Sequence, residues 1–112
     1  MADTFKTQLG TTRAGERSRI WIEGARLVAA GFTCGARFRR TFQTLHAASL
    51  TLEIISEQQF ETLPVSQRGT VSGKGAKPII DITGTIVRDT FGKGTHVAVT
   101  YTRNTITITT AE

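Results

Sequence analysis

Arginines are the residues whose type and spacing suggest chemistry in this sequence. Arg17 and Arg19 lie two positions apart, as do Arg37 and Arg39, so each pair faces one side of an extended strand. Arg40 falls on the opposite side, among apolar residues, and is expected at a sheet margin. A guanidinium group donates two parallel hydrogen bonds to a single phosphate. The spacing therefore predicts a basic stripe that binds a polyanion.

The charge distribution points to the same half of the chain. The sequence has a net charge of +5, and residues 1–55 hold eight basic and four acidic side chains, against six and five in residues 56–112. A solvated surface that only keeps the protein soluble is the alternative. The predicted nucleic-acid-binding residues are Arg17, Arg19, Arg26, Arg37, Arg39 and Arg40. Polar side chains that could reach base edges from a long turn are Gln43, Thr44 and His46.

Motifs for catalysis, metal binding or nucleotide binding are not apparent. Gly73-Lys74-Gly75 is interpreted as part of a linker, because no Lys-Ser or Lys-Thr pair follows it at the start of a helix. His46, His96 and Cys34 are isolated in the sequence, whereas a metal site needs clustered ligands. We therefore expect no enzymatic activity, no metal and no cofactor.

Composition favours a small intracellular protein. The chain has 112 residues, of which 38% are hydrophobic, enough for one small core. Its single cysteine is typical of a reducing compartment. The N-terminus does not resemble a signal peptide, and no apolar run approaches the ~20 residues of a membrane span. We expect a cytoplasmic protein, or one acting inside a host cell, with no membrane association.

The sequence also repeats itself. Ile20-Trp21-Ile22-Glu23-Gly24 is matched by Ile80-Asp81-Ile82-Thr83-Gly84, and each is followed by a short segment and a turn containing Phe and Gly. Two alternating stretches then follow in both copies, which is typical of half-buried strands. The alternation predicts a shared core of Ile20, Ile22, Leu27, Phe32, Phe38, Leu50, Leu52, Ile80, Ile82, Phe91, Val97, Val99, Ile106 and Ile108.

This repetition predicts the organisation of the chain. The expected parts are a flexible N-terminal tail (1–17), a first repeat (18–63), a linker (64–77) and a second repeat (78–112). Short helices are expected over 25–30 and 85–90, and one helical turn after a Ser56 cap.

The stretch from Ile20 to Gly35, followed by the hairpin from Phe38 to Ile54, resembles the AbrB superfamily of swapped-hairpin domains, and is most similar to its SymE-like branch. The resemblance implies a mostly β fold, in which two tandem swapped-hairpin repeats form one small pseudo-dimeric barrel. It also implies that Arg19 contacts DNA, since AbrB-type regulators usually carry an arginine at the start of this strand.

The sequence departs from the family pattern in two ways. The arginine pair on the family's helix is reduced to Arg26 in the first copy and Arg88 in the second. Ile79 occupies the position in the second copy that corresponds to Arg19 in the first. The second copy is therefore expected to be mainly structural. Family members usually build the barrel from two chains, so this chain is expected to form the equivalent of a dimer by itself, and a homodimer of such chains is possible.

Three functions follow as hypotheses. The first is a DNA-binding transcriptional regulator that uses the basic face of the first repeat, with DNA favoured over RNA as the partner. The second is a SymE-like toxin of a toxin–antitoxin system acting on nucleic acid. The third is a small inhibitor that binds a protein partner through exposed sheet edges.

Overall fold

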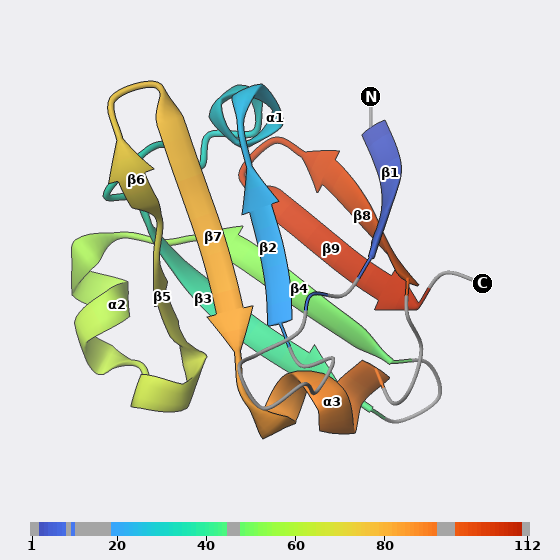
Figure 1. Ribbon diagram of the computed structural model, residues 1–112. Helices are drawn as coiled ribbons and strands as arrows, with labels where there is room; N and C mark the ends of the chain where they lie inside the picture. Colours follow the sequence, from blue (N-terminus) through green and yellow to red (C-terminus); the bar gives the residue numbers. More distant parts are fainter. Residues whose placement is uncertain (1–2, 9, 11–18, 45–47, 92–95, 111–112) are drawn as a thin grey trace.

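The computed structural model describes residues 3–8, 10, 19–44, 48–91 and 96–110, and the protein is mostly β (Figure 1). The strands are β1 (Asp3–Gln8), β2 (Arg19–Glu23), β3 (Arg37–Gln43), β4 (Ser49–Ile54), β5 (Arg68–Thr70), β6 (Ser72–Lys74), β7 (Lys77–Thr83), β8 (His96–Thr102) and β9 (Thr105–Thr110). The helices are α1 (Ala25–Ala29), α2 (Glu57–Thr62) and α3 (Thr85–Phe91), with a 3-10 turn, η1 (Val65–Gln67).

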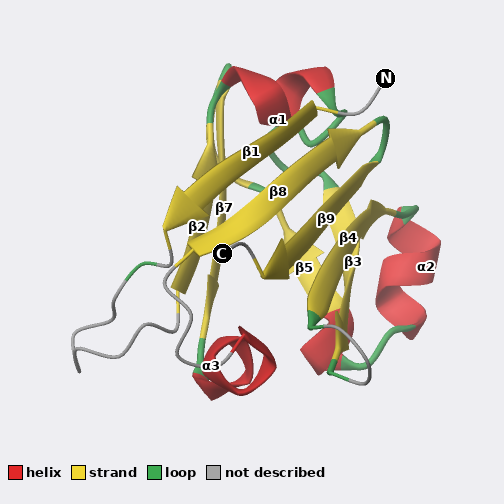
Figure 2. Ribbon diagram, turned by 90° about the vertical axis from the view of Figure 1, so that its right-hand side faces the viewer, coloured by secondary structure: helices red, strands yellow, loops and turns green. Residues whose placement is uncertain are grey.

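The strands form two antiparallel sheets. One has the order β1-β8-β9-β4-β3-β5 and the other β2-β7-β6 (Figure 2). The two sheets meet at two corners. At one, the chain passes from β5 to β6 through Val71, and at the other, Gly10 after β1 forms an isolated bridge with Arg19 of β2.

The barrel that the family resemblance predicts is not closed among the described residues. β5 and β6 are three residues each, and a single bridge joins the other corner. These contacts are too short to carry a continuous hydrogen-bond ladder from one sheet to the other. The architecture is therefore two packed sheets joined at their corners.

Strands from the two halves of the chain pair with each other. β2 pairs with β7, with Ile20 opposite Ile82 and Ile22 opposite Ile80. β4 pairs with β9, so that the β3–β4 and β8–β9 hairpins lie side by side in the larger sheet. Each half thus supplies the other with a neighbouring strand in both sheets.

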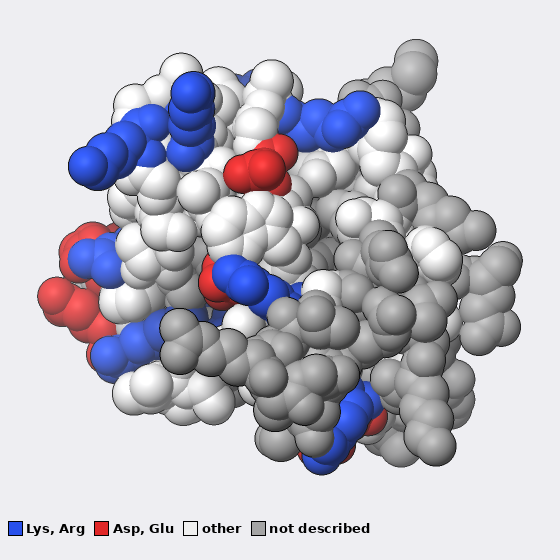
Figure 3. Space-filling view, viewed as in Figure 1, with Lys and Arg blue, Asp and Glu red and all other residues white. Residues whose placement is uncertain are grey.

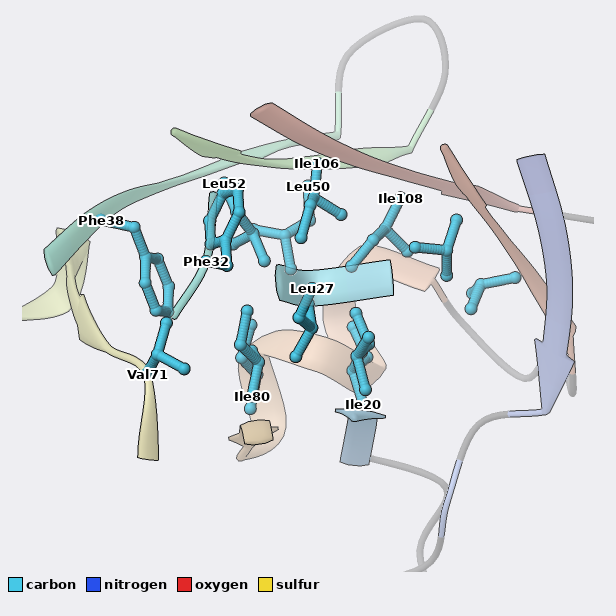
Figure 4. Close-up of a cluster of buried hydrophobic side chains, with 14 of the residues drawn as sticks. Ile20, Leu27, Phe32, Phe38, Leu50, Leu52, Val71, Ile80, Ile106 and Ile108 are labelled. Carbon is cyan, nitrogen blue, oxygen red and sulfur yellow. The ribbon is translucent and has the colours of Figure 1, made fainter. Parts of the chain in front are cut away.

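One hydrophobic core lies between the sheets, and all fourteen residues predicted to form it are buried. Figure 4 shows Leu27 of α1 between Ile20 and Ile80 of one sheet and Leu50, Ile106 and Ile108 of the other. The alternation of buried and exposed positions along β2, β7, β8 and β9 gives each strand one apolar face. The prediction of a single core shared by both halves is confirmed.

Local sequence accounts for the three helices, which lie where they were predicted. α1 ends at Ala29, and Gly31 just beyond it has a φ of 92°, which is readily adopted only by glycine. The Phe32 amide donates to the Leu27 carbonyl at 2.8 Å. Ser56 caps α2, because its hydroxyl accepts from the Gln59 amide while the Gln59 side chain accepts from the Ser56 amide.

Two segments are more ordered than the sequence predicts. Asp3–Gln8, in the expected flexible tail, forms β1 because the outer edge of β8 offers it a hydrogen-bond ladder. The expected linker carries η1, β5 and β6, and its Val71 is 2% exposed. Val71 is held there by backbone hydrogen bonds with Gly35 and Ala36, both at 2.9 Å.

Over the described ranges, no helix has the length and apolar character needed to cross a membrane.

The shared core makes a direct prediction for stability. Leu27→Ala and Ile108→Ala remove side chains that are fully buried on opposite halves. Each should lower the free energy of unfolding by about 2–5 kcal/mol. Chemical denaturation followed by circular dichroism should show a single transition for both variants. Val65→Ala is the control, since Val65 is 77% exposed, and it should change stability by less than about 0.5 kcal/mol. Separate transitions for the two halves would contradict a shared core.

Candidate nucleic-acid interface

The predicted arginines are divided among three elements. Arg19 begins β2, Arg26 lies on α1, and Arg37, Arg39 and Arg40 lie on β3. The remaining predicted residue, Arg17, lies outside the described residues, as does His46 of the predicted readout set; Gln43 and Thr44 of that set are exposed at the end of β3.

Arg37 is engaged by neighbouring residues through all three of its guanidinium nitrogens. Nε and Nη2 donate to the two carboxylate oxygens of Glu57 at 3.0 and 3.4 Å, and Nη1 donates to the Thr70 hydroxyl at 2.9 Å. The guanidinium also stacks 4.5 Å from the centre of the Phe60 ring. These contacts attach α2 to β3, so the role the structure shows for Arg37 is structural.

Arg19 forms a two-point ion pair across the smaller sheet. Its Nε and Nη2 donate to the two oxygens of Asp81 at 2.9 and 3.0 Å, and its guanidinium lies 4.6 Å from the centre of the Trp21 ring. Trp21 is 41% exposed on the outer face of this sheet. Asp81 belongs to β7, so this pair joins the two halves of the chain.

Arg39 and Arg40 also have partners close by. Arg39 Nη2 lies 3.4 Å from a Glu53 carboxylate oxygen on the adjacent strand, and Arg40 Nη2 donates to the Ser66 carbonyl at 2.9 Å. Burial lowers the pKa of Arg40 below its ordinary value. Ion pairs that remain this exposed add little to stability, but they do occupy donors that a phosphate would need.

A second group of cations surrounds α1, and we call it the α1-end cluster. Its members are exposed and, within the described part of the chain, none forms an ion pair with a carboxylate. They are Arg26, Lys74, Lys77 and Arg103. Glu23, at the end of β2, is an exposed acidic residue nearby.

Backbone contacts bring these four residues to one end of the molecule. Lys74 and Lys77 are opposite each other in the β6–β7 hairpin. The next residue, Pro78, accepts a hydrogen bond from Gly24 just before α1, and Asn104 of the β8–β9 turn donates to Ala30 just after it. Figure 3 shows blue side chains along this upper edge with a red acidic side chain between them, and further blue next to red lower on the same face.

The β8–β9 turn is held firmly against the end of α1. Asn104 has a φ of 64°, as tight hairpin turns require, and a Cβ at Gly31 would lie 2.7 Å from its side-chain oxygen. A cavity of about 590 Å³ lies beside this contact and is lined by Arg26, Tyr101 and Arg103, among others. Two cations therefore face one open hollow.

Aromatic residues support Arg26. Its guanidinium lies 3.4 Å from the centre of the Phe5 ring, and Phe5 packs edge-on against Tyr101 with 6.0 Å between ring centres. Burial raises the pKa of Tyr101 above its ordinary value of 10.0, and the nearby positive charge of Arg26 partly offsets this increase. β1 thus helps to orient a member of the α1-end cluster.

The candidate residues chosen from the sequence did not include Lys74, Lys77 and Arg103. Each lies beside a tight turn, at Gly75-Ala76 or at Asn104, and turn residues project into solvent. The turn residues beside these cations could be recognised in the sequence. The sequence did not show that the two turns lie close to α1.

Groups suited to metal binding do not gather in the described residues, where no three His, Cys, Asp or Glu side chains lie together. The Cys34 thiol donates to the Gly75 carbonyl at 3.4 Å and lies near the β6–β7 hairpin.

No protein-family model, curated protein or solved structure matches this chain.

The environment of Tyr101 predicts its titration. It is the only tyrosine in the chain, so the ultraviolet absorbance of tyrosinate reports it alone. Its pKa should lie above 10.0, and Arg26→Ala should raise the pKa further by removing the neighbouring cation. Because the folded state holds this proton more tightly, stability should fall as the pH rises past the ordinary tyrosine pKa of about 10. Arg88→Ala is the control and should leave the titration unchanged.

The Arg19–Asp81 pair predicts a change in tryptophan accessibility. Trp21 is the only tryptophan, and Asp81→Asn should release the guanidinium that covers its ring. Quenching of Trp21 fluorescence by acrylamide should increase, while stability changes by less than about 1 kcal/mol because the pair is exposed. Asp89→Asn on α3 serves as the matched control. Equal quenching in both variants would show that the ion pair does not position Arg19 over the ring.

Proposed function

We propose that the protein binds nucleic acid, as a DNA-binding regulator, and that the α1-end cluster makes the main phosphate contacts. The observation that carries this proposal is the availability of its four cations. They are exposed and form no ion pair in the described part of the chain, whereas Arg19, Arg37 and Arg39 each contact a carboxylate. Cations with free donors release the counterions of a polyanion when they bind it, which drives the association.

The geometry of the cluster suits a phosphate backbone. Its members come from three elements that are fixed to one another by the hydrogen bonds at Gly24 and Ala30. Because the backbone that carries the four cations is already fixed, no backbone segment has to be ordered when a phosphate backbone binds. Arg26 and Arg103 at the cavity beside α1 supply the planar guanidinium groups that bind one anion with two hydrogen bonds.

We also propose that the two halves are tandem swapped-hairpin repeats of the SymE-like kind, which together act as a pseudo-dimer. The antiparallel pairing of β2 with β7 and of β4 with β9 supports this, since equivalent strands of the two halves meet each other. In such an arrangement each hairpin packs near the helix of the other half. The β8–β9 turn beside α1 has this relation, and it brings Arg103 of the second half to Arg26 of the first.

Binding to labelled duplex DNA by fluorescence anisotropy at two salt concentrations tests the proposal. A variant with Arg26, Lys74, Lys77 and Arg103 all changed to Ala should bind much more weakly. The slope of log affinity against log salt should become shallower by about 0.9 for each phosphate contact that is lost. Circular dichroism should show that the variant remains folded, because all four side chains are exposed.

The control removes the same number of positive charges elsewhere, by changing Arg19, Arg37, Arg39 and Arg88 to Ala. It should lose less affinity, because these side chains are already close to carboxylates. If the control loses as much as the test variant, net charge alone sets the affinity and the α1-end cluster has no special role.

Growth arrest on overexpression, in place of selective binding to particular DNA fragments, would favour the toxin hypothesis over the regulator.

A further inference from the structure

A separate surface lies where β3 loses its partner strand. β3 is paired with β4 along its length, but on its other side the ladder with β5 covers only Arg37–Arg39. After Arg39 the facing chain belongs to η1. The end of β3, from Arg40 to Gln43, therefore has no strand partner on this side within the described residues, and a strand added there would have to displace η1.

The hydrogen-bonding groups at this edge can be assigned from those of its neighbours. Val71 on the β5 side donates to the Ala36 carbonyl, and Ile55 on the β4 side donates to the Arg37 carbonyl. Backbone groups of successive residues in a strand point to opposite sides. The amide and carbonyl groups of Arg40 and Phe42 therefore point toward the open side, where the described residues provide no strand partner.

A cavity of about 430 Å³ lies at this edge, and we call it the β3-edge groove. It is lined by both Arg39 and Arg40. Neighbouring side chains on a strand lie on opposite faces of the sheet, so a hollow that both of them line has to lie at the strand's edge. Ser66 and Gln67 of the η1 turn form another wall.

Both arginines have an unsatisfied donor here. The Nε atoms of Arg39 and Arg40 are buried and have no hydrogen-bond partner among the described residues. A buried donor without a partner is costly, and more so when it belongs to a charged group. Because Arg39 and Arg40 lie on opposite faces of β3, a segment bound at this edge would need one carboxylate on each face to reach both guanidinium groups.

Apolar side chains complete the groove. Phe42 is half-buried on β3, and Ile86 of α3 is 41% exposed. The groove thus combines open backbone groups, two unsatisfied cationic donors and apolar contacts. An extended peptide can use all three, because it carries amide and carbonyl groups at strand spacing and side chains on both faces. A nucleic-acid backbone has no such ladder of amides.

We propose that the β3-edge groove binds an acidic, extended segment of a partner protein, which adds to the larger sheet as a strand beside β3. Backbone hydrogen bonds to Arg40 and Phe42 supply the pairing. Carboxylates of the segment bind Arg39 and Arg40, replacing the present contacts of Arg39 with Glu53 and of Arg40 with the Ser66 carbonyl. This site is independent of the nucleic-acid contacts proposed at α1.

The test uses a short fluorescein-labelled peptide of alternating Glu and Val, titrated with the full chain and followed by anisotropy. Replacing Glu by Gln in the peptide should weaken binding about tenfold or more, because charge-assisted hydrogen bonds are lost. Alternate amides of the peptide can be N-methylated in two ways, at the odd or at the even positions. Only one of these two peptides should lose binding, because only one set of amides faces β3. Hydrogen exchange at the amides of Arg40 and Phe42 should slow when the unmodified peptide is bound.

Protein variants locate the site. Arg39→Gln and Arg40→Gln should each weaken binding of the Glu-Val peptide, and Arg103→Gln, the same charge change in the α1-end cluster, should not. If a variant fails to fold, the peptide series with the unaltered protein still decides the question. Binding that is insensitive to N-methylation in both registers would overturn strand addition. Displacement of the peptide by a DNA duplex that protects the same two amides would overturn the choice of a protein partner.

Discussion

The structure depends on the two halves of the chain burying their apolar faces against each other. Each half contributes strands with one apolar face to both sheets. Pairing β2 with β7 and β4 with β9 places strands of both halves in both sheets, and a single core then forms between the sheets. Because a core this small is barely sufficient for a chain of this length, the halves depend on each other for stability.

The same arrangement separates the cations into two classes. Arginines on strands lie directly across from residues of neighbouring strands, and some of these are acidic, as with Arg39 opposite Glu53 and Arg19 beside Asp81. Lys74 lies opposite another cation, Lys77, and Arg103 lies in the β8–β9 turn, so neither has an acidic cross-strand neighbour. Whether a basic residue is available to bind a polyanion therefore depends on whether its neighbours in space are acidic. The number of charges in its part of the sequence matters less. This is why we place the phosphate contacts at the α1 end.

The two proposed surfaces are at different ends of the molecule. α1 and α3 lie at opposite ends in both ribbon views, with the α1-end cluster at one and the β3-edge groove beside Ile86 of α3 at the other (Figures 1 and 2). A nucleic acid and a protein partner could then be bound at the same time. A regulator that holds DNA at one end and an acidic segment at the other would connect the two partners without further domains.

The sequence alone determined which residues face inward and where the helices start and stop. Eleven of the fourteen core positions could be read from strand alternation, and Leu27, Phe32 and Phe91 from the short helices and Phe-Gly turns. The Ser56 cap and the Gly31 stop could be read from local backbone chemistry, because both depend on neighbours within a few positions. Tertiary structure alone decided that β1 joins β8 and that Val71 enters the core, since both depend on edges made by distant segments. It also decided which arginines meet carboxylates and which cations gather around α1. Charged side chains pair only when they lie within a few ångströms of one another. The spacing of residues along the chain does not show which of them do.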